Sequence, residues 1–316
     1  MRLGVTGASG FLGSAIVKEA VKRGWSVVGF SRNIDSKIEG CEEVRQFSDL
    51  EVINLQGLDA VIHLAGESLL GMWTRDKKNR IRSSRIQLTS DIVQEFRDMP
   101  RHTRPKTFVS ASAVGIYGDR GDVWLDEESD AGFGFLAKVC KDWESAAMEA
   151  ASLGVRVVTP RLGIVLGKGG GALGQMRRIF NLGLGGRLGS GLQWMSWIHI
   201  DDAARAFLEC VENKEIRGGV NFVTPRPEPN AVFTDALAGA LNRKAIFPVP
   251  KFILKSLPGG MHEMFLSSQR VDPVVLKAFG FKWDHEMLGN SFYDLYAGPE
   301  PEYDLEAERD EDTDSD

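Results

Sequence analysis

The seven residues GASGFLG at positions 7–13 have the composition and spacing of a turn that binds phosphate groups. Glycine permits a tight turn and lets backbone N–H groups approach a pyrophosphate, and a following helix adds the positive end of its dipole. The motif lies between an apolar run at 3–6 and an amphipathic stretch at 12–22, which is the strand-to-helix context that it requires. We therefore predict contacts with a dinucleotide from Gly7, Ser9, Gly10, Phe11, Leu12 and Gly13.

The residues after the second apolar run indicate which dinucleotide is bound. An acidic residue at this point binds the ribose 2′-hydroxyl of NAD, but the chain has Ser31, Arg32 and Asn33 here. A hydroxyl and a guanidinium can bind a 2′-phosphate. A charge-assisted hydrogen bond of about 1.5–3 kcal/mol corresponds to a preference of roughly ten- to hundredfold. We predict that Ser31 and Arg32 favour NADP(H) over NAD(H).

The elements that position these residues alternate between short apolar runs and longer amphipathic stretches up to about residue 225. This alternation is typical of stacked β-α-β units. The apolar runs are continuous, as expected for strands covered on both faces. We predict a doubly wound parallel sheet. Expected strands are 3–6, 27–30, 44–47, 60–64, 107–111 and 155–159, and expected helices include 12–22, 76–97 and 135–152.

The sequence changes character after Pro225, where the segment PRPEPN begins a proline-rich connector. Helical spacing then recurs at 233–241, 252–257 and 273–279. We predict a dinucleotide-binding domain at 1–229 with a substrate-side insertion at about 167–198, a small, mainly helical C-terminal region at 230–298, and an acidic tail at 299–316.

Charge is concentrated in that tail. Residues 300–316 hold ten acidic side chains and one basic one, Arg309, a net of −9 in a chain of net −6, so the rest carries about +3. A nearly neutral body offers no broad basic surface for nucleic acid. The tail has the composition of a solvated, disordered extension, with an interaction tail as the alternative.

Composition excludes several other classes of protein. The 316 residues are 43% hydrophobic and 26% charged, which is ordinary for a soluble globular chain of about two domains. Three separated cysteines form neither a disulfide framework nor a paired metal motif, and GxSxG and HExxH motifs are absent. No apolar window reaches about 18 residues, and no secretory leader is apparent. We expect a cytoplasmic protein whose partner is a small-molecule substrate, with no nucleic acid, membrane or metal partner.

Further motifs are typical of one superfamily. They are DAVIHLAGE, SSRIQLT, SASAVGIYGDRGD, FLAKVCKDWE, GSGLQWMSWIHIDD, PVPKFILK and SSQRVDP, and with the glycine turn they extend the match over residues 1 to about 298. The chain resembles the extended short-chain dehydrogenase/reductase superfamily. Within it, the chain is most similar to the atypical branch called the NAD-dependent epimerase or cell-division-inhibitor-like epimerase family. The resemblance implies a Rossmann fold with a small helical C-terminal region.

The resemblance also implies further contacts with the cofactor. Asp49 and Leu50, after the third expected strand, match the pair that meets the adenine. Leu64, Ala65 and Gly66, after the fourth, match the segment that passes under the cofactor ribose. Small residues suit that position because they permit a close approach of the backbone.

The usual catalytic pair of the superfamily is a tyrosine followed four residues later by a lysine, and this chain lacks it. Alignment on Glu144 puts Leu136 and Cys140 at the two positions. None of the four tyrosines has a lysine four residues on. Arg85 stands where the superfamily commonly has an asparagine, and we place it on the substrate side.

An acid or base must then come from other residues near the strand ends that face the nicotinamide. The candidates are Glu67, Ser112 and Tyr117. Glu67 follows the glycine of LAGE, where partial burial is expected to raise its pKa, and Ser112 lies near the serine position of the superfamily. Each has a structural alternative: Glu67 caps a loop, Ser112 satisfies a backbone group, and Tyr117 only packs its ring.

The segment 193–199 resembles the substrate-side loop of nucleotide-sugar enzymes, and from it we select Gln193, Trp194 and Trp197. In one strand the two tryptophans point to opposite faces, so that one lines a pocket and the other packs away. Burial of both is the alternative. His199 precedes Asp201 and Asp202. A metal ligand is one interpretation of this histidine, but we favour a helix cap.

These patterns support two functions. The first is an NADP(H)-binding oxidoreductase or epimerase-like enzyme that acts on a small polar or nucleotide-linked substrate. The second is a non-catalytic NADP(H)-binding sensor or regulator that kept the dinucleotide site without the catalytic pair. The aromatic and polar segment 193–199 favours the enzyme, and the missing tyrosine favours the sensor.

Overall fold

The computed structural model of the chain describes residues 1–33, 35–47 and 53–297. Its main sheet has the strand order β12-β8-β5-β4-β1-β2-β3, with β6 paired to β8, and every pair is parallel. The first strand, β1, therefore lies between β2 and β4, and the chain reverses its direction of winding there. In such sheets ligands bind at the carboxyl ends of the strands on either side of this point. The strands are β1 (Arg2–Thr6), β2 (Ser26–Ser31), β3 (Glu43–Gln46), β4 (Ala60–His63), β5 (Thr107–Ser110), β6 (Ser112–Ala113), β8 (Arg156–Leu162) and β12 (Gly218–Phe222).

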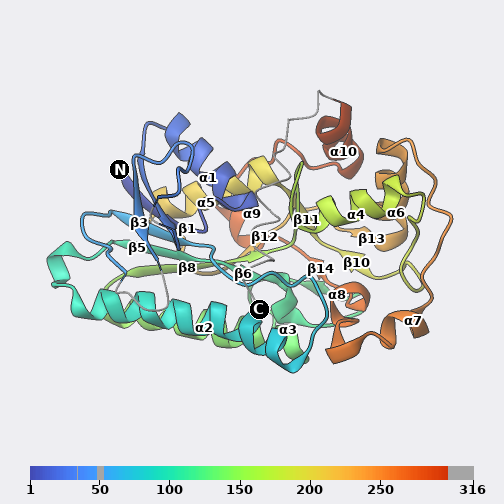
Figure 1. The fold of residues 1–316 in the computed structure, drawn as a ribbon, viewed down its shortest axis with the longest axis horizontal. Helices are drawn as coiled ribbons and strands as arrows, with labels where there is room; N and C mark the ends of the chain where they lie inside the picture. Colours follow the sequence, from blue (N-terminus) through green and yellow to red (C-terminus); the bar gives the residue numbers. More distant parts are fainter. Residues whose placement is uncertain (34, 48–52, 298–316) are drawn as a thin grey trace.

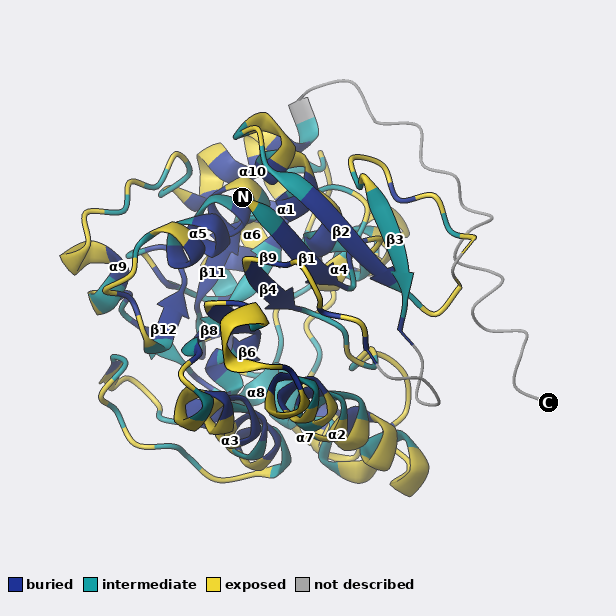
Figure 2. Ribbon diagram, turned by 90° about the vertical axis from the view of Figure 1, so that its left-hand side faces the viewer, coloured by how far each residue is buried: buried dark blue, intermediate teal, exposed yellow. Residues whose placement is uncertain are grey.

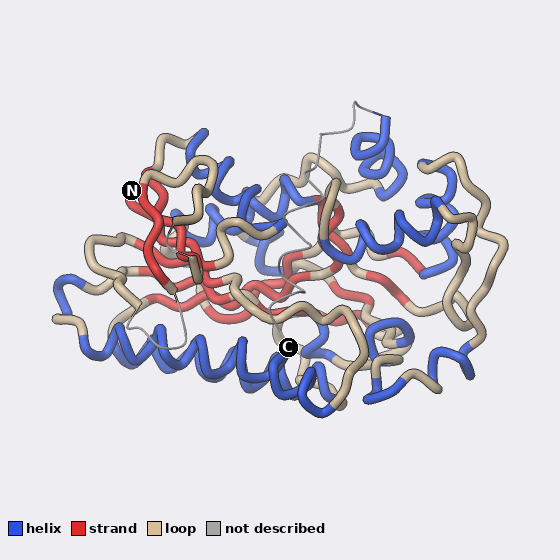
Figure 3. The backbone as a smooth tube through the Cα atoms, in the orientation of Figure 1, coloured by secondary structure: helices blue, strands red, loops and turns tan. Residues whose placement is uncertain are grey.

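Helices cover both faces of this sheet (Figure 1). The first layer contains α1 (Phe11–Lys22) and α5 (Ile200–Glu212), and the second contains α2 (Arg75–Asp98) and α3 (Phe135–Met148). Figure 3 shows the strands running between these two layers. The prediction of a doubly wound parallel sheet is confirmed.

Alternation of side chains along the strands builds two separate cores. In β2, Val27 packs with the α1 and α5 layer and Val28 packs with the α2 and α3 layer. The central strands are buried on both faces (Figure 2). Burial of a valine or leucine side chain contributes about 1.5–3 kcal/mol to folding, so continuous apolar runs are what a two-sided sheet requires.

A third core joins the predicted insertion to the C-terminal region. Leu173 and Trp197 from the insertion pack with Phe233 and Phe292 from the C-terminal helices. Three expected helices correspond to α6, α7 and α9, whereas α4, α8 and α10 were not expected. The elements are β7 (Trp124–Leu125), β9 (Ile164–Leu166), α4 (Gly171–Asn181), β10 (Trp194–Met195), β11 (Trp197–His199), β13 (Glu228–Pro229), α6 (Asn230–Ala240), α7 (Lys251–Lys255), α8 (Glu263–Leu266), β14 (Arg270–Val271), α9 (Val274–Ala278) and α10 (Leu288–Ala297).

Two expected elements have different boundaries in the structure. The helix expected at 135–152 ends at Met148 and continues as a 3-10 helix that Gly154 closes with φ of +82°. The strand expected at 193–199 is divided into β10 and β11, which pair with different partners, β13 and β9. The break falls at Ser196, because its hydroxyl donates to the Gln269 carbonyl at 2.8 Å and accepts from the Val271 N–H at 3.0 Å.

Among the residues that the structure describes, no helix has both the length and the apolar composition needed to cross a membrane.

Candidate dinucleotide and active site

The glycine turn lies at the carboxyl end of β1 and leads directly into α1. Gly7 has φ of +72°, and its carbonyl accepts a hydrogen bond from the Gly10 N–H at 3.0 Å. A Cβ on Gly13 would collide with the carbonyl of Gly7, so only glycine allows α1 to start this close to the turn. Gly10 is the N-cap residue, and no side chain caps the helix. The first N–H groups of α1 are therefore placed to bind an anion.

A second glycine-rich segment lies against this turn. A Cβ on Gly167, Gly170 or Gly171 would come within 3.0 Å of the ring of Phe11. The glycines lie between β9 and the first residues of α4, and this connection is held against the first residue of α1. The glycines at 167–171 are explained by this close approach, which spacing along the sequence does not reveal.

The segment after β4 completes the floor of the site. Thr6, opposite His63 in the sheet register, accepts hydrogen bonds from the N–H groups of Leu64 and Ala65 at 3.1 and 3.3 Å. A Cβ on Gly7 would lie 3.3 Å from the Ala65 nitrogen. The structure thus places Leu64 and Ala65 directly beside the glycine turn, and their contact with the cofactor ribose stays a prediction.

Ser31 and Arg32 lie at the carboxyl end of β2, the strand next to β1. The hydroxyl of Ser31 accepts from the Asn33 N–H at 3.2 Å and lies 3.1 Å from the Ser36 hydroxyl. Arg32 is exposed to solvent at this end of the sheet. Asp49 and Leu50, the predicted adenine contacts, lie outside the described residues.

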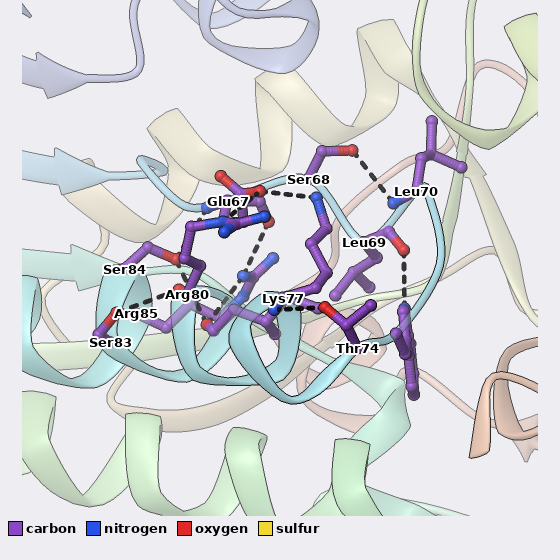
Figure 4. Close-up of polar contacts among 12 residues, drawn as sticks. Glu67, Ser68, Leu69, Leu70, Thr74, Lys77, Arg80, Ser83, Ser84 and Arg85 are labelled. Atoms are coloured by element: carbon purple, nitrogen blue, oxygen red, sulfur yellow. Dashed lines mark hydrogen bonds and ion pairs between the residues drawn. The ribbon is translucent and has the colours of Figure 1, made fainter. Parts of the chain in front are cut away.

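Glu67 follows this segment and forms an ion pair with the first turns of α2 (Figure 4). Its carboxylate lies 2.6 Å from Lys77 Nζ and 3.7 Å from Arg80 Nε. Burial by itself raises the pKa of this carboxyl, but the hydrogen bond and charge of Lys77 and the charge of Arg80 outweigh it, so the pKa lies below its usual value. The expectation of a raised pKa is therefore wrong, because α2 brings Lys77 and Arg80, ten and thirteen residues further along the chain, to this carboxylate.

Arg85 lies under this loop in the interior. It donates to the carbonyls of Glu67 and Ile81 at 2.9 and 3.2 Å, and its guanidinium lies 5.4 Å from the ring centroid of Trp143. It also packs against Gly66. These contacts hold the segment 66–67 in place. The predicted place of Arg85 on the substrate side stays a prediction.

Ser112 and Tyr117 lie in a buried polar network. Ser112 donates to Glu144 at 2.6 Å, and Arg161 donates to both carboxylate oxygens of Glu144 at 3.0 Å. The hydroxyl of Tyr117 donates to Asn221 at 2.7 Å and accepts from Arg161 at 2.9 Å. Burial raises the pKa of Tyr117 to about 12 despite the charge of Arg161. These contacts favour packing and positioning for both residues over proton transfer.

The positions that align with the usual tyrosine and lysine carry no group for that chemistry. The Leu136 side chain faces Gly115. The thiol of Cys140 is buried, and burial, together with the charge of Glu144, raises its pKa to about 12. The structure therefore agrees with the sequence that the usual proton relay is missing at this place.

The two tryptophans of 193–199 have different environments. Trp197 is fully buried and donates to the Arg226 carbonyl at 3.1 Å. Trp194 is partly exposed and donates to Asp122 at 2.6 Å, with the guanidinium of Arg270 4.1 Å from its ring centroid. The ring of Trp197 therefore packs in the interior and that of Trp194 reaches the surface, whereas the lining of a substrate pocket by Trp194 stays a prediction.

The other polar residues of this segment have structural contacts. Gln193 donates to the carbonyls of Leu188 and Phe265, both at 3.0 Å, and so joins two loops. His199 caps α5, because its Nδ1 accepts from the Asp201 N–H at 3.3 Å. The helix-cap interpretation of His199 is confirmed.

The parallel sheet, its glycine turn and the helix that starts there define a dinucleotide-binding protein of the Rossmann type. More specifically, the chain belongs to the NAD dependent epimerase/dehydratase family, whose model matches residues 3–223. Residues 249–295 match a domain of unknown function, DUF1731.

Relatives extend over nearly the whole chain. The epimerase family protein SDR39U1 homolog, chloroplastic, from Arabidopsis thaliana is 36% identical over 295 residues, which is 91% of this chain and 84% of the relative. The epimerase family protein ML0860 of Mycobacterium leprae is 34% identical over 289 residues, 91% of this chain and 93% of the relative.

Two solved structures are also similar. The human epimerase family protein SDR39U1, isoform 2, with NADPH has a TM-score of 0.85 at 31% identity, covering 95% of this chain and all of that one. A nucleoside-diphosphate sugar epimerase from Corynebacterium glutamicum has a TM-score of 0.74 at 31% identity, covering 94% of this chain and 58% of that one.

Proposed function

We propose that this protein is an NADP(H)-binding oxidoreductase or epimerase-like enzyme that acts on a small polar or nucleotide-linked substrate. The observation that carries the proposal is the juxtaposition of the glycine turn, the open start of α1 and the Ser31–Arg32 pair at adjacent strand ends. The human relative with NADPH supports the cofactor. The sugar epimerase from Corynebacterium glutamicum supports the substrate class.

The preference for NADP(H) rests on the end of β2. A 2′-phosphate carries charge that a guanidinium binds and a carboxylate repels, and this end of the strand has Arg32 and no acidic side chain among residues 31–33. The Ser31 hydroxyl is held by local hydrogen bonds in the same turn. A bound NADP(H) supplies or accepts a hydride, and the protein must bind it, orient it and move a proton.

We assign the proton transfer to Glu67. Of the three candidates, only Glu67 has a side chain that reaches solvent, at 31% exposure, whereas Ser112 and Tyr117 are buried and engaged with other side chains. Because the pKa of Glu67 is lowered, it is a carboxylate at neutral pH and accepts a proton rather than donating one. Lys77, 2.6 Å away, holds the carboxylate in position.

The first experiment is a titration of the cofactor-stripped protein with NADPH and with NADH, followed by tryptophan quenching. Arg32→Ala is expected to weaken NADPH binding about ten- to hundredfold and to leave NADH binding nearly unchanged. Arg217→Ala is the matched control, because Arg217 is exposed and directly precedes β12, at the amino end of the sheet. Equal loss of both nucleotides in Arg32→Ala would contradict the assigned preference.

The absence of a residue pair for the usual relay favours a second candidate, a non-catalytic NADP(H)-binding sensor or regulator. Leu136 and Cys140 occupy the two positions, and the nearby Tyr117 hydroxyl is engaged with Arg161 and Asn221. A panel of nucleotide sugars and small carbonyl compounds, assayed for NADPH oxidation, separates the two functions. An enzyme loses turnover in Glu67→Gln while NADPH binding is unchanged, whereas a sensor binds NADPH and shows no turnover with any compound.

A further inference from the structure

The stretch of chain from β9 to β11 contains basic residues but no acidic ones. Between residues 163 and 200 there are four lysines and arginines and no aspartate or glutamate, which gives this stretch a net charge of +4. Residues 1–299 carry about +3 in total, so the rest of the body is close to neutral. The net positive charge of the body therefore comes from this stretch, at Lys168, Arg177, Arg178 and Arg187.

Three of these cations form a basic segment, Lys168, Arg177 and Arg178, along α4 and the connection before it. Lys168 and Arg177 are partly exposed, and Arg178 is exposed. Lys168 directly follows Gly167, which packs against the ring of Phe11, the first residue of α1. The basic segment therefore starts beside the glycine turn and extends along α4, which is about 16 Å long.

The last helix of the described chain ends beside this basic segment. Leu173 of α4 and Phe292 of α10 belong to the same core, and Figure 1 shows both helices in the same half of the molecule. The guanidinium of Arg177 lies 5.7 Å from the ring centroid of Tyr296. Because Tyr296 is the penultimate residue of α10, the chain continues toward the acidic tail at 299–316 from a point close to Arg177.

The acidic tail has the length and the charge to cover the basic segment. Ten of its residues are acidic and one is basic. An extended chain covers about 3.3–3.6 Å per residue, so a segment of this length reaches roughly 60 Å, well beyond the length of α4. A single exposed ion pair is weak, but several carboxylates that meet three cations act together. Since the tail is joined to the chain close to Arg177, its effective concentration at the basic segment is of the order of millimolar.

We propose that the acidic tail docks on the basic segment of its own chain and competes there with the dinucleotide. The carboxylates of the tail and the phosphate groups of NADP(H) are anions, and both are attracted to the positive charge beside the glycine turn. The docked tail weakens NADP(H) binding, and salt, which screens exposed charges, releases the tail. The docking uses only charges of this chain, whereas the competition rests on the proposed function.

The first experiment measures docking without a cofactor. It uses the full chain with each acidic residue of 300–316 replaced by its amide, and a fluorescein-labelled peptide of residues 299–316 as the probe. Fluorescence anisotropy is expected to show binding at about 0.02 M salt and loss of binding at about 0.5 M, where exposed charges are screened. The wild type is expected to bind the peptide at least about tenfold more weakly, because its own tail occupies the site.

Charge reversal in the same amide variant locates the docking surface. Arg177→Glu with Arg178→Glu, and separately Lys168→Glu, are expected to weaken peptide binding about fivefold or more. Arg101→Glu with Lys106→Glu is the matched control and is expected to bind as before, because both cations are exposed and lie before β5. Circular dichroism reports that each variant is folded. Peptide binding that is absent, or that persists unchanged after reversal at Arg177 and Arg178, overturns the docking.

The second experiment measures the competition. Titration with NADPH at about 0.02 M salt, followed by tryptophan quenching, is expected to show at least about threefold tighter binding by the amide variant than by the wild type. The difference is expected to vanish at about 0.5 M salt. Equal affinities at low salt overturn the competition. Peptide binding as expected, with NADPH binding in no variant, supports the docking and contradicts the proposed function.

Discussion

Substitution of Gly13 by alanine tests the close contact on which the dinucleotide site depends. The added Cβ would collide with the carbonyl group of Gly7 and the Cα of Ala8, which are backbone atoms and cannot turn away. Overpacking of this kind costs about 1–3 kcal/mol. Because the turn must open to relieve it, we expect Gly13→Ala to lower both the stability of the protein and its affinity for NADPH.

Gly239 provides the matched control. It lies within α6, and a Cβ there meets nothing within 4 Å. Alanine in a helix is better than glycine by about 0.5–1 kcal/mol, so Gly239→Ala should stabilise the protein and leave NADPH binding unchanged. The two variants make the same chemical change, and the structure predicts opposite signs for them.

The assay is thermal and urea unfolding of both variants beside the wild type, with NADPH titration by tryptophan quenching. Melting temperatures should fall by several degrees for Gly13→Ala and rise slightly for Gly239→Ala. If Gly13→Ala is as stable as Gly239→Ala and binds NADPH like the wild type, α1 does not start against the turn as described, and the argument for the site is refuted.

Three further predictions concern buried groups. Tyr117→Phe leaves Asn221 Oδ1 and an N–H of Arg161 without a partner, so urea unfolding should show a loss of about 1–3 kcal/mol, and a loss below about 0.5 kcal/mol would contradict the network. Burial lowers the pKa of His63 to about 3, so its contribution to stability is complete above the unfolded pKa and falls by about 1.4 kcal/mol per unit as the pH drops below about 6.5. His63→Gln should lose less stability between pH 7 and 5, and parallel profiles would refute the assignment. The thiol of Cys140, with its pKa raised to about 12, should react with a disulfide reagent at neutral pH only after unfolding, and a prompt native reaction would show that it is accessible.

The features that the sequence predicts well are those set by neighbours in the chain. The strand, glycine turn and helix at 2–22 depend on local periodicity and on backbone conformations that glycine permits, so their types and order are correct. The division of Val27 and Val28 between two cores follows from the period of a strand. The sequence predicts helix ends less accurately because they depend on contacts outside the helix, as the early end of α3 shows.

Features that depend on residues far away in the sequence are not predicted by local patterns. The pKa of Glu67 is set by Lys77 and Arg80, whose orientation toward the carboxylate depends on how the loop 67–74 returns to α2. The sequence shows His199 beside two aspartates and so suggests a cap. The ring of His285, 86 positions later, stacks on that of His199, and Asp202 binds the backbone at 284–285 beside this contact.

The candidate catalytic residues show the same difference between what local sequence predicts and what distant contacts decide. An aligned position says which chemistry has been lost, and Leu136 and Cys140 show that the usual tyrosine and lysine are missing. The alignment does not identify the residues that replace the tyrosine and lysine, because a side chain from another helix or loop can reach the same part of the site. Glu67 lies in the segment after β4 rather than on α3, two residues beyond Ala65, which packs against Gly7, and this place makes it the residue to test.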